Sequence, residues 1–243
     1  MHIVKLDATD STNQYLKELM FSRELEDFTI VITDKQLNGR GQMGAKWEAE
    51  PGKNLTLSVL KKNKNLDISD QFLLNICTSL ALIETLKGLS ITDLTVKWPN
   101  DILSGNLKIC GILIENVLSG NHIQASILGI GLNVNQLTFD TLSNVSSLKL
   151  LLGRTLNLEE LLPKIIENLK WSFAELEKKN FKGLWEAYES NLFRKDKPST
   201  FKNNQGDLFM GFIRKISSQG RLVVELEDSV FKEYDLKEIR LLY

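Results

Sequence analysis

Three glycines and one arginine lie within six consecutive positions, in the segment Gly39-Arg40-Gly41-Gln42-Met43-Gly44. Glycines at this density let the backbone turn sharply and bring its N–H groups against a ligand. The guanidinium of Arg40 can give a carboxylate or a phosphate two directed hydrogen bonds. The segment precedes a predicted strand and not a helix, so it does not match the dinucleotide-binding pattern. The alternative is a flexible turn with a solvated arginine, and glycine spacing alone favours that alternative.

A second polar group follows at Lys97-Trp98-Pro99-Asn100-Asp101. The proline ends a predicted strand, because it cannot donate to the ladder of hydrogen bonds. A lysine, an amide and a carboxylate crowded at a strand end suit the handling of phosphate and Mg²⁺. A capped turn with an exposed charge pair explains the same residues equally well.

The segment Lys108-Ile109-Cys110-Gly111-Ile112-Leu113-Ile114-Glu115 places a lysine at the start of an otherwise apolar strand. Lys108 is either an edge residue that extends to solvent or a group that neutralises negative charge in a reaction. Gly111 leaves room for a ligand to approach the backbone. Cys110 is interpreted as a small buried hydrophobic residue and not as a nucleophile.

Two further groups have a ligand-binding and a structural interpretation. Gly129 and Gly131 alternate along a predicted strand and leave two gaps on one face, as a floor for a flat ligand or as a site of close packing. The cluster Asp10-Ser11-Thr12-Asn13 precedes a helix predicted to begin near Gln14. Taken alone, that cluster favours helix capping.

The elements that must position these groups alternate along the chain. Strands are predicted at 28–34, 54–61, 93–98, 107–117 and 121–134, and helices are predicted from Ser69 to Leu86 and at 157–178 and 180–192. Ser69 is the expected N-cap of its helix, and Ser119-Gly120-Asn121 is the expected turn of a hairpin. Short strand-like runs in 194–243 predict a small β-barrel.

The composition of the 243 residues excludes several classes of protein. The net charge of -1 lacks the basic excess that is typical of nucleic-acid binding. Neither a signal-peptide core nor an apolar run long enough to span a membrane is present in the sequence. Two cysteines, Cys77 and Cys110, are too few for a disulfide framework. We therefore expect a cytoplasmic protein that binds neither DNA nor membrane.

The order of the motifs decides more than any motif alone. The series DSTN, Gln36, GRGQMG, Trp47, KWPND, KICGIL and GIGLNV closely resembles the catalytic domain of biotin–protein ligases over residues 7–134. The resemblance implies an α+β fold, with a mixed β-sheet packed with helices as in class II aminoacyl-tRNA synthetases and biotin ligases. It also implies a catalytic domain at 1–192 and a small C-terminal SH3-like barrel at 193–243.

The resemblance implies a reaction in two halves, with biotin and ATP as substrates and Mg²⁺ as cofactor. Biotin first forms biotinyl-5′-AMP, and a lysine of a biotin-carboxyl-carrier domain then takes the biotinyl group. Lys108 and Arg40 match the catalytic positions. The positions implied for biotin are Ser11, Thr12, Asn13, Gln36, Gly39, Arg40, Gly41, Gln42, Lys108 and Gly111. The positions implied for ATP or the adenylate are Arg40, Gln42, Trp47, Lys97, Asn100, Asp101, Lys108, Gly131 and Asn133, with Asp101 also the implied Mg²⁺ ligand.

Two departures from the family pattern stand out. Gln42 replaces a second arginine of many bacterial members, so the phosphate site loses one charge. The DSTN motif begins at Asp10, which leaves no room before it for the DNA-binding domain of some members. We therefore expect the monofunctional type, an enzyme and not a repressor, that is either a monomer or a homodimer.

Two other functions remain open at this point. A lipoate–protein ligase shares the fold and the adenylation chemistry, although its glycine-rich and lysine motifs differ. A non-catalytic protein that binds biotin or biotinyl-AMP would need the pocket but not Lys108.

Overall fold

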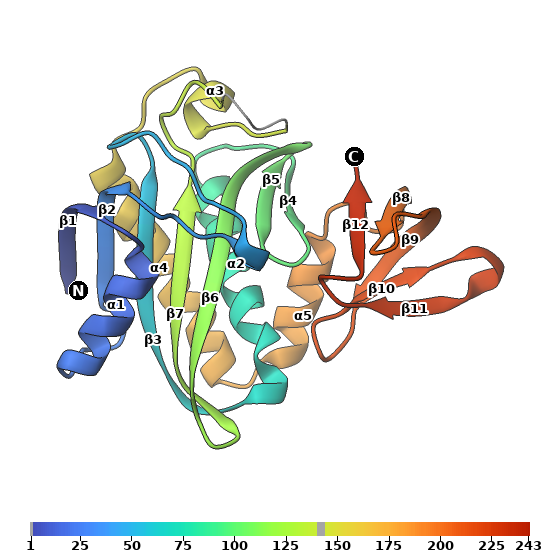
Figure 1. The fold of residues 1–243 in the computed structure, drawn as a ribbon, viewed down its shortest axis with the longest axis horizontal. Helices are drawn as coiled ribbons and strands as arrows, with labels where there is room; N and C mark the ends of the chain where they lie inside the picture. The colour runs from blue at the N-terminus through green and yellow to red at the C-terminus, as the bar shows by residue number, and fades with distance from the viewer. Residues whose placement is uncertain (1, 140–143) are drawn as a thin grey trace.

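A seven-stranded mixed sheet forms the larger part of the computed structural model, which describes residues 2–139 and 144–243 (Figure 1). Its strand order is β1-β2-β3-β7-β6-β5-β4. The strands are β1 (Ile3–Thr9), β2 (Ile30–Gln36), β3 (Leu55–Asp67), β4 (Leu94–Lys97), β5 (Asp101–Ser104), β6 (Leu107–Ser119) and β7 (His122–Leu132). Strand β1 pairs parallel to β2, and the other neighbours pair antiparallel. The predicted mixed sheet is confirmed.

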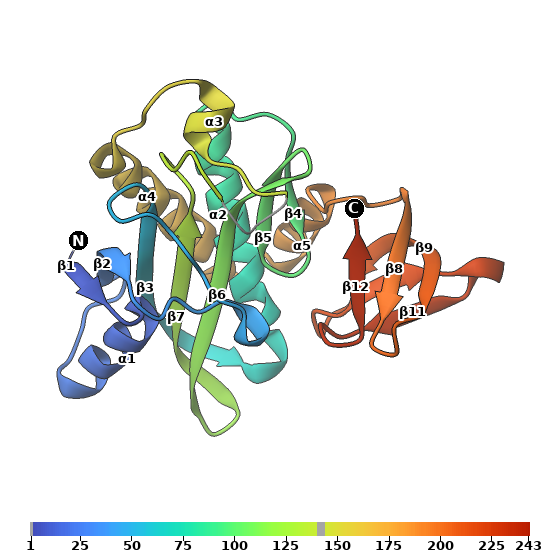
Figure 2. The same ribbon diagram turned by 45° about the horizontal axis from the view of Figure 1, so that its top comes forward.

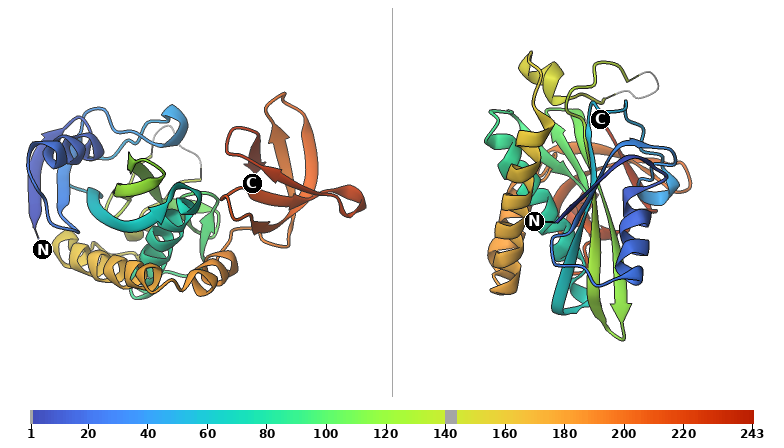
Figure 3. Two further views of the ribbon diagram at one scale, coloured as in Figure 1. Left: turned by 90° about the horizontal axis from the view of Figure 1, so that it is seen from below. Right: turned by 90° about the vertical axis from the view of Figure 1, so that its left-hand side faces the viewer.

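Helices cover both faces of this sheet. They are α1 (Thr12–Ser22), α2 (Phe72–Lys87), α3 (Leu148–Leu152), α4 (Leu158–Glu177) and α5 (Phe181–Ser190). Helix α1 lies on one face and α4 on the other, as the edge-on view of Figure 3 shows. Alternate residues of β3 follow this division, since Leu57 and Val59 join the core under α2 and α4, whereas Leu60 packs with Leu16 of α1.

Several predicted boundaries were wrong. Ser69 does not cap α2, because it lies in a 3-10 turn (Ile68–Asp70), and Gln71 occupies the cap position before Phe72. The first helix begins at Thr12 and not near Gln14. Strand β5 was not predicted, because the sequence signal at Asp101 was interpreted as a turn. The hairpin at Ser119-Gly120-Asn121 is present, with β6 and β7 paired antiparallel from Ser119 opposite His122.

The C-terminal region forms a separate antiparallel sheet of five strands in the order β11-β10-β9-β8-β12 (Figure 2). Its strands are β8 (Pro198–Asn203), β9 (Leu208–Ile216), β10 (Leu222–Glu225), β11 (Phe231–Tyr234) and β12 (Ile239–Leu242). The indole Nε1 of Trp98, at the end of β4, donates to the carbonyl of Gly220 at 2.8 Å. A Cβ at Gly220 would lie 2.5 Å from the ring of Phe72, so the glycine permits close contact between the β9–β10 turn and helix α2.

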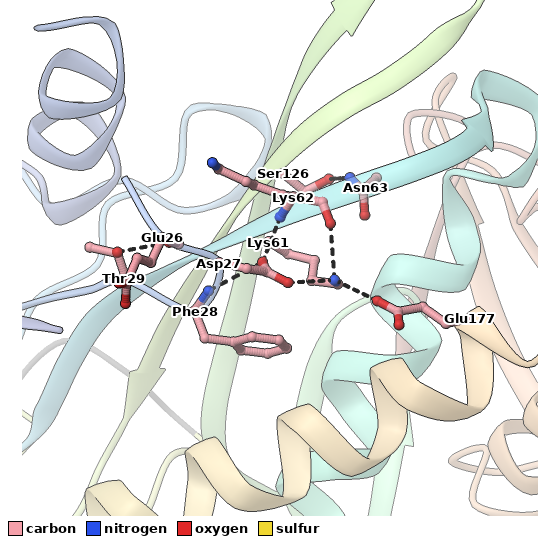
Figure 4. A network of polar contacts seen from close by, with 9 residues as sticks. All are labelled: Glu26, Asp27, Phe28, Thr29, Lys61, Lys62, Asn63, Ser126 and Glu177. Atoms are coloured by element: carbon pink, nitrogen blue, oxygen red, sulfur yellow. Dashed lines mark hydrogen bonds and ion pairs between the residues drawn. The ribbon is translucent and has the colours of Figure 1, made fainter. Parts of the chain in front are cut away.

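Strand β3 carries an ion cluster around the buried Lys61 on the face that packs against α4 (Figure 4). The ammonium of Lys61, whose side chain is 3% exposed, donates to Asp27 Oδ2 at 2.8 Å and to Glu177 Oε1 at 2.9 Å. Its third bond goes to the carbonyl of Lys62 at 2.9 Å. The network ties the segment before β2 to the end of α4, and all three ammonium hydrogens have a partner.

Among the described residues, the helices are too short or too polar to cross a membrane.

Candidate active site

A pocket of about 230 Å³ opens between the N-terminus of α1, the glycine-rich loop and strands β3, β5, β6 and β7. Most of the residues singled out by the sequence line it together. They are Ser11, Thr12, Asn13, Gln36, Arg40, Gly41, Gln42, Trp47, Asn100, Asp101, Lys108, Gly111 and Gly131. Segments that are distant in the sequence therefore meet at one cavity because the strand order brings β3, β7 and β6 side by side.

Three of the predicted site residues lie outside this lining. Gly39 lines a neighbouring cavity on the outer side of the loop. Lys97 lines a cleft between the two sheets, which shares Gln42, Asn100 and Asp101 with the pocket. Asn133 is buried behind the pocket, where its Nδ2 donates to the carbonyl of Ser146 at 3.1 Å. Its Oδ1 has no partner among the described residues.

One wall of the pocket is a group of buried hydroxyl and amide side chains. The backbone N–H of Thr12 donates to Gln36 Oε1 at 2.9 Å, and the Thr12 hydroxyl lies 3.2 Å from the same oxygen. Ser58 of β3 lies behind them, with its Oγ 2.7 Å from Thr12 Oγ1 and 2.6 Å from Asn13 Oδ1. Sequence reasoning missed Ser58, because it lies in an apolar strand without a motif.

A second residue that sequence reasoning missed is Glu115, near the middle of β6. Its Oε2 accepts from Asn13 Nδ2 at 2.6 Å and lies 3.9 Å from a guanidinium nitrogen of Arg40. Glu115 was the final residue of the KICGILIE segment, but its carboxylate received no role. The structure brings it to the junction between α1 and the glycine-rich loop.

The opposite end of the pocket holds an ion pair and an aromatic ring. Lys108 Nζ lies 2.7 Å from Asp101 Oδ1, and both side chains are partly exposed to the pocket. The indole of Trp47 covers two glycines that pair across β6 and β7, since a Cβ on Gly131 would lie 2.3 Å from the ring and one on Gly111 would lie 3.0 Å from it. The Trp47 Nε1–H is buried and has no acceptor among the described residues.

The glycine-rich loop folds back on itself before it reaches β3. The N–H of Gly41 donates to the carbonyl of Ala45 at 2.6 Å, and the N–H of Trp47 donates to the carbonyl of Gly39 at 3.0 Å. A Cβ on Gly39 would lie 2.2 Å from the Trp47 carbonyl oxygen, so only glycine fits there without a shift of the backbone. This hairpin holds the guanidinium of Arg40 at the pocket with its side chain 46% exposed.

Two titratable groups near the pocket have perturbed pKa values. Burial lowers the pKa of the Lys97 ammonium, and the positive charges of Lys108 and Arg240 lower it further against the opposing effect of Asp101. Burial raises the pKa of the Cys110 thiol, which is fully enclosed. A neutral, inaccessible thiol cannot act as a nucleophile, in agreement with its interpretation as a core residue.

The arrangement suits the joining of two anions. Two cationic side chains, Arg40 and Lys108, line the same cavity, and each pairs with one carboxylate among the described residues. Preorganised positive charge of this kind stabilises negative charge that accumulates in a reaction. The polar wall beyond them can select a ligand by its hydrogen-bond pattern.

Residues 6–133 match the Biotin/lipoate A/B protein ligase family. The Bifunctional ligase/repressor BirA of Bacillus subtilis is 27% identical over 241 residues, which cover 96% of this chain and 72% of that protein. A Biotin–[acetyl-CoA-carboxylase] ligase of Paracoccus denitrificans is 35% identical over 132 residues, which cover 53% of each chain.

Solved structures show the same similarity at the level of the fold. Biotin protein ligase from Aquifex aeolicus, in complex with biotin and ATP, superposes with a TM-score of 0.82 at 25% identity, over 99% of this chain and 98% of that one. The biotin protein ligase of Leishmania major, in complex with biotinyl-5-AMP, superposes with a TM-score of 0.63 at 20% identity, over 96% of this chain and 98% of that one. Both similarities extend through the C-terminal sheet.

Proposed function

The chain belongs to the biotin/lipoate A/B protein ligase family, and from that premise we propose that it is an ATP-dependent biotin–protein ligase. It activates biotin as biotinyl-5′-AMP and transfers the biotinyl group to a lysine of a biotin-carboxyl-carrier domain. The similarity to ligases whose structures contain biotin and ATP supports both substrates. The observation that carries the proposal is the convergence of Arg40, Lys108 and the polar wall of Thr12, Asn13 and Gln36 on one pocket.

In the first half-reaction, a carboxylate oxygen of biotin attacks the α-phosphorus of ATP, and pyrophosphate leaves. The carboxylate and the phosphate repel each other, so their approach requires positive charge on both sides. Arg40 and Lys108 supply that charge from the loop and from β6. The loop would also exclude water from the mixed anhydride, which water hydrolyses.

In the second half-reaction, the amine nitrogen of the acceptor lysine attacks the carbonyl carbon of the anhydride. The carbon–oxygen bond to AMP breaks, AMP leaves with the electron pair, and the amine loses a proton. Lys108 stabilises the oxyanion that forms on the carbonyl oxygen and the charge on the leaving phosphate. The hydrogen bonds that fold the glycine-rich loop into a hairpin join residues of the loop itself. An acceptor domain can therefore approach the pocket without breaking them.

The adenine is assigned to the region between Trp47 and Asn133. Two buried atoms there lack partners among the described residues, the Trp47 Nε1–H donor and the Asn133 Oδ1 acceptor. Buried polar atoms are normally hydrogen-bonded, so the unpaired donor of Trp47, which lines the pocket, supports a polar ligand there. Asn133 follows the pocket-lining Gly131 by two residues along the chain. An adenine offers both ring acceptors and an exocyclic amino donor.

Asp101 and Asn100 fit the modest protein contribution that a nucleotide-bound Mg²⁺ requires. Magnesium in such sites keeps several waters and takes one or two carboxylates besides the phosphates. The described residues contain no cluster of three or more His, Cys, Asp or Glu side chains, so Mg²⁺ would be held largely by the nucleotide phosphates. When bound, Mg²⁺ would neutralise phosphate charge.

The remaining proposals concern organisation and partners. We place the boundary between the catalytic domain and the C-terminal domain at 192/193, between the end of α5 and the start of β8. The biotin-carboxyl-carrier domain is the proposed acceptor, and the net charge of -1 argues against a DNA partner. Two free, buried cysteines agree with a cytoplasmic location. A homodimer is also proposed, and analytical ultracentrifugation would measure the mass of the assembly.

A substrate comparison tests the function directly. Biotin or lipoate is added with ATP, and pyrophosphate release is measured, followed by transfer of labelled biotin to a purified carrier domain. We expect release and transfer with biotin. Turnover with lipoate alone would instead identify a lipoate–protein ligase. Tight binding of biotin without pyrophosphate release or transfer would identify a non-catalytic binding protein.

A further inference from the structure

The orientation of the Asn13 amide depends on its hydrogen bond to Glu115. Asn13 is 3% exposed, and its amide nitrogen donates to the Leu113 carbonyl at 3.2 Å and to Glu115 Oε2 at 2.6 Å. Both donor hydrogens of the amide are therefore used inside the protein. Its Oδ1 accepts one bond, from the Ser58 hydroxyl at 2.6 Å. One lone pair of Oδ1 is left for a ligand.

The carboxylate of Glu115 decides which way round this amide sits. An ionised carboxylate only accepts hydrogen bonds, and so does the Leu113 carbonyl. A flipped Asn13 would place its oxygen against these two acceptors, and neither would then have a donor from the amide. Oδ1 is thus held toward Ser58 and the cavity. Gly129 makes room for it, because a Cβ there would lie 2.5 Å from Asn13 Oδ1.

The neighbouring amide is fixed with the opposite polarity. Gln36 Oε1 is occupied by the backbone N–H of Thr12 at 2.9 Å, and a backbone N–H cannot be reversed. The Nε2 of Gln36 is therefore the atom that remains for a ligand. Side by side, the wall offers one acceptor, Asn13 Oδ1, and one donor, Gln36 Nε2.

We propose that Glu115 is a positioning residue that fixes Asn13 as a hydrogen-bond acceptor, so that the wall matches a cyclic urea. A urea has N–H donors on either side of a carbonyl acceptor, which is the complement of this acceptor and donor pair. An acid of similar length without a urea, such as lipoate, leaves both wall groups unpaired. A site with unpaired buried polar groups rejects such an analogue far more strongly than apolar contact can. This inference rests on the proposed function.

Replacement of Glu115 by glutamine tests the role of the charge at nearly constant shape. A glutamine can present its Nε2 to Asn13, so the orientation of the Asn13 amide is no longer fixed. For E115Q we expect a KM for biotin that is raised roughly tenfold, as for the loss of one hydrogen bond between the ligand and Asn13. The melting temperature should stay close to that of the wild type, and the KM for ATP should change less than the KM for biotin, because Glu115 also lies 3.9 Å from Arg40. E84Q is the matched control, because Glu84 forms a partly exposed pair with Lys87 on α2.

A pair of variants at Asn13 and Glu115 makes the test sharper. Aspartate at position 13 offers an acceptor to the cavity but sets a second carboxylate against Glu115, whose oxygen lies 2.6 Å from the replaced atom. N13D should therefore lose more biotin affinity than E115Q. In N13D/E115Q the glutamine can donate to the new aspartate, and we expect the double variant to bind biotin more tightly than N13D alone.

Biotin binding by calorimetry and pyrophosphate release with biotin and lipoate are measured for every variant. The proposal predicts a smaller preference for biotin over lipoate in E115Q and partial recovery in N13D/E115Q. It is overturned if E115Q keeps the wild-type KM for biotin, if its KM for ATP rises equally, or if the double variant is weaker than N13D. E115Q alone decides the matter if N13D does not fold. A wild-type enzyme that fails to use biotin contradicts the proposed function itself, and that outcome is separate.

Discussion

Strand β3 carries two buried polar networks, one on each face, and they differ in what they leave unpaired. On the face toward α4, the three hydrogens of the Lys61 ammonium meet Asp27, Glu177 and the Lys62 carbonyl. On the face toward α1, Ser58 joins Thr12 and Asn13, and the wall keeps an acceptor and a donor free. Burial of polar groups does not by itself distinguish scaffold from site. Unused hydrogen-bonding capacity beside a cavity does.

The cations of the two regions also differ in how fully carboxylates pair with them. Lys61 has two carboxylates within 2.9 Å and almost no contact with solvent. In the pocket, Arg40 and Lys108 have one carboxylate each, at 3.9 Å and 2.7 Å. An arriving carboxylate or phosphate can compete for the pocket cations but cannot reach the ammonium of Lys61. The comparison predicts that the pocket variants alter activity and the Lys61 variants alter stability.

The largest expected effect is on the pocket side. Arg40→Ala and Lys108→Ala should each lower biotin-dependent pyrophosphate release by about a hundredfold or more, as for the removal of one group that stabilises transition-state charge. Gln42→Ala should cost far less, because a neutral amide adds no charge to the phosphate site. Steady-state kinetics with biotin and ATP measure the three losses.

Thermal unfolding of the same variants supplies the control. Both cations are partly exposed, so their removal should shift the melting temperature little. Comparable activity losses in all three variants would contradict the ranking. A large drop in melting temperature for Lys108→Ala would show that Lys108 contributes to stability as Lys61 does, which contradicts the expected difference between the two regions.

The next effect is on the Lys61 side. Lys61→Met should lower the free energy of unfolding by about 2 kcal/mol, because it leaves Asp27 and Glu177 without their shared cation, although both carboxylates keep some access to solvent. Lys62→Met is the matched control on the same strand, since Lys62 is half-exposed and lies 3.8 Å from Glu24. Urea denaturation measures both free energies.

Activity per folded molecule should not change in Lys61→Met. Within the network, Asp27→Asn should destabilise more than Glu177→Gln, because Asp27 also accepts from the backbone N–H of Lys62 at 2.7 Å. A rise in the KM for biotin with unchanged stability would show that the network serves the site after all.

Sequence reasoning identified most of the pocket but neither of the residues that complete its polar wall. The resemblance to biotin–protein ligases assigned Thr12, Gln36, Arg40 and Lys108 to one site, and the structure brings all four to the lining of one pocket. Ser58 and Glu115 belong to none of the motifs that carry that resemblance. Their contacts with Asn13 join residues 45 and 102 positions apart, so they depend on the pairing of β3, β7 and β6.

The helices and strands show the same limit of local sequence signals. The long helices and the β6–β7 hairpin followed from local periodicity and turn residues. Strand β5 did not, because its four residues are ordered by pairing with β4 and β6 and not by their own preference. The partners of Lys61 are 34 and 116 positions away, and no local signal reveals them.

A third lysine gives the smallest effect and sharpens the comparison of the other two. Lys97 lines the cleft next to the pocket, and burial together with Lys108 and Arg240 lowers the pKa of its ammonium. If Lys97 holds ATP, the protonated form is the one that attracts phosphate. As pH rises through the lowered pKa, the charge is lost, and the KM for ATP should rise severalfold while the KM for biotin changes less.

Lys97→Arg should flatten this rise, because a guanidinium keeps its proton above pH 12. The measurement is the KM for ATP across the alkaline range in both proteins. An identical rise in Lys97→Arg would assign the pH dependence to another group and leave Lys97, like Lys61, a structural residue.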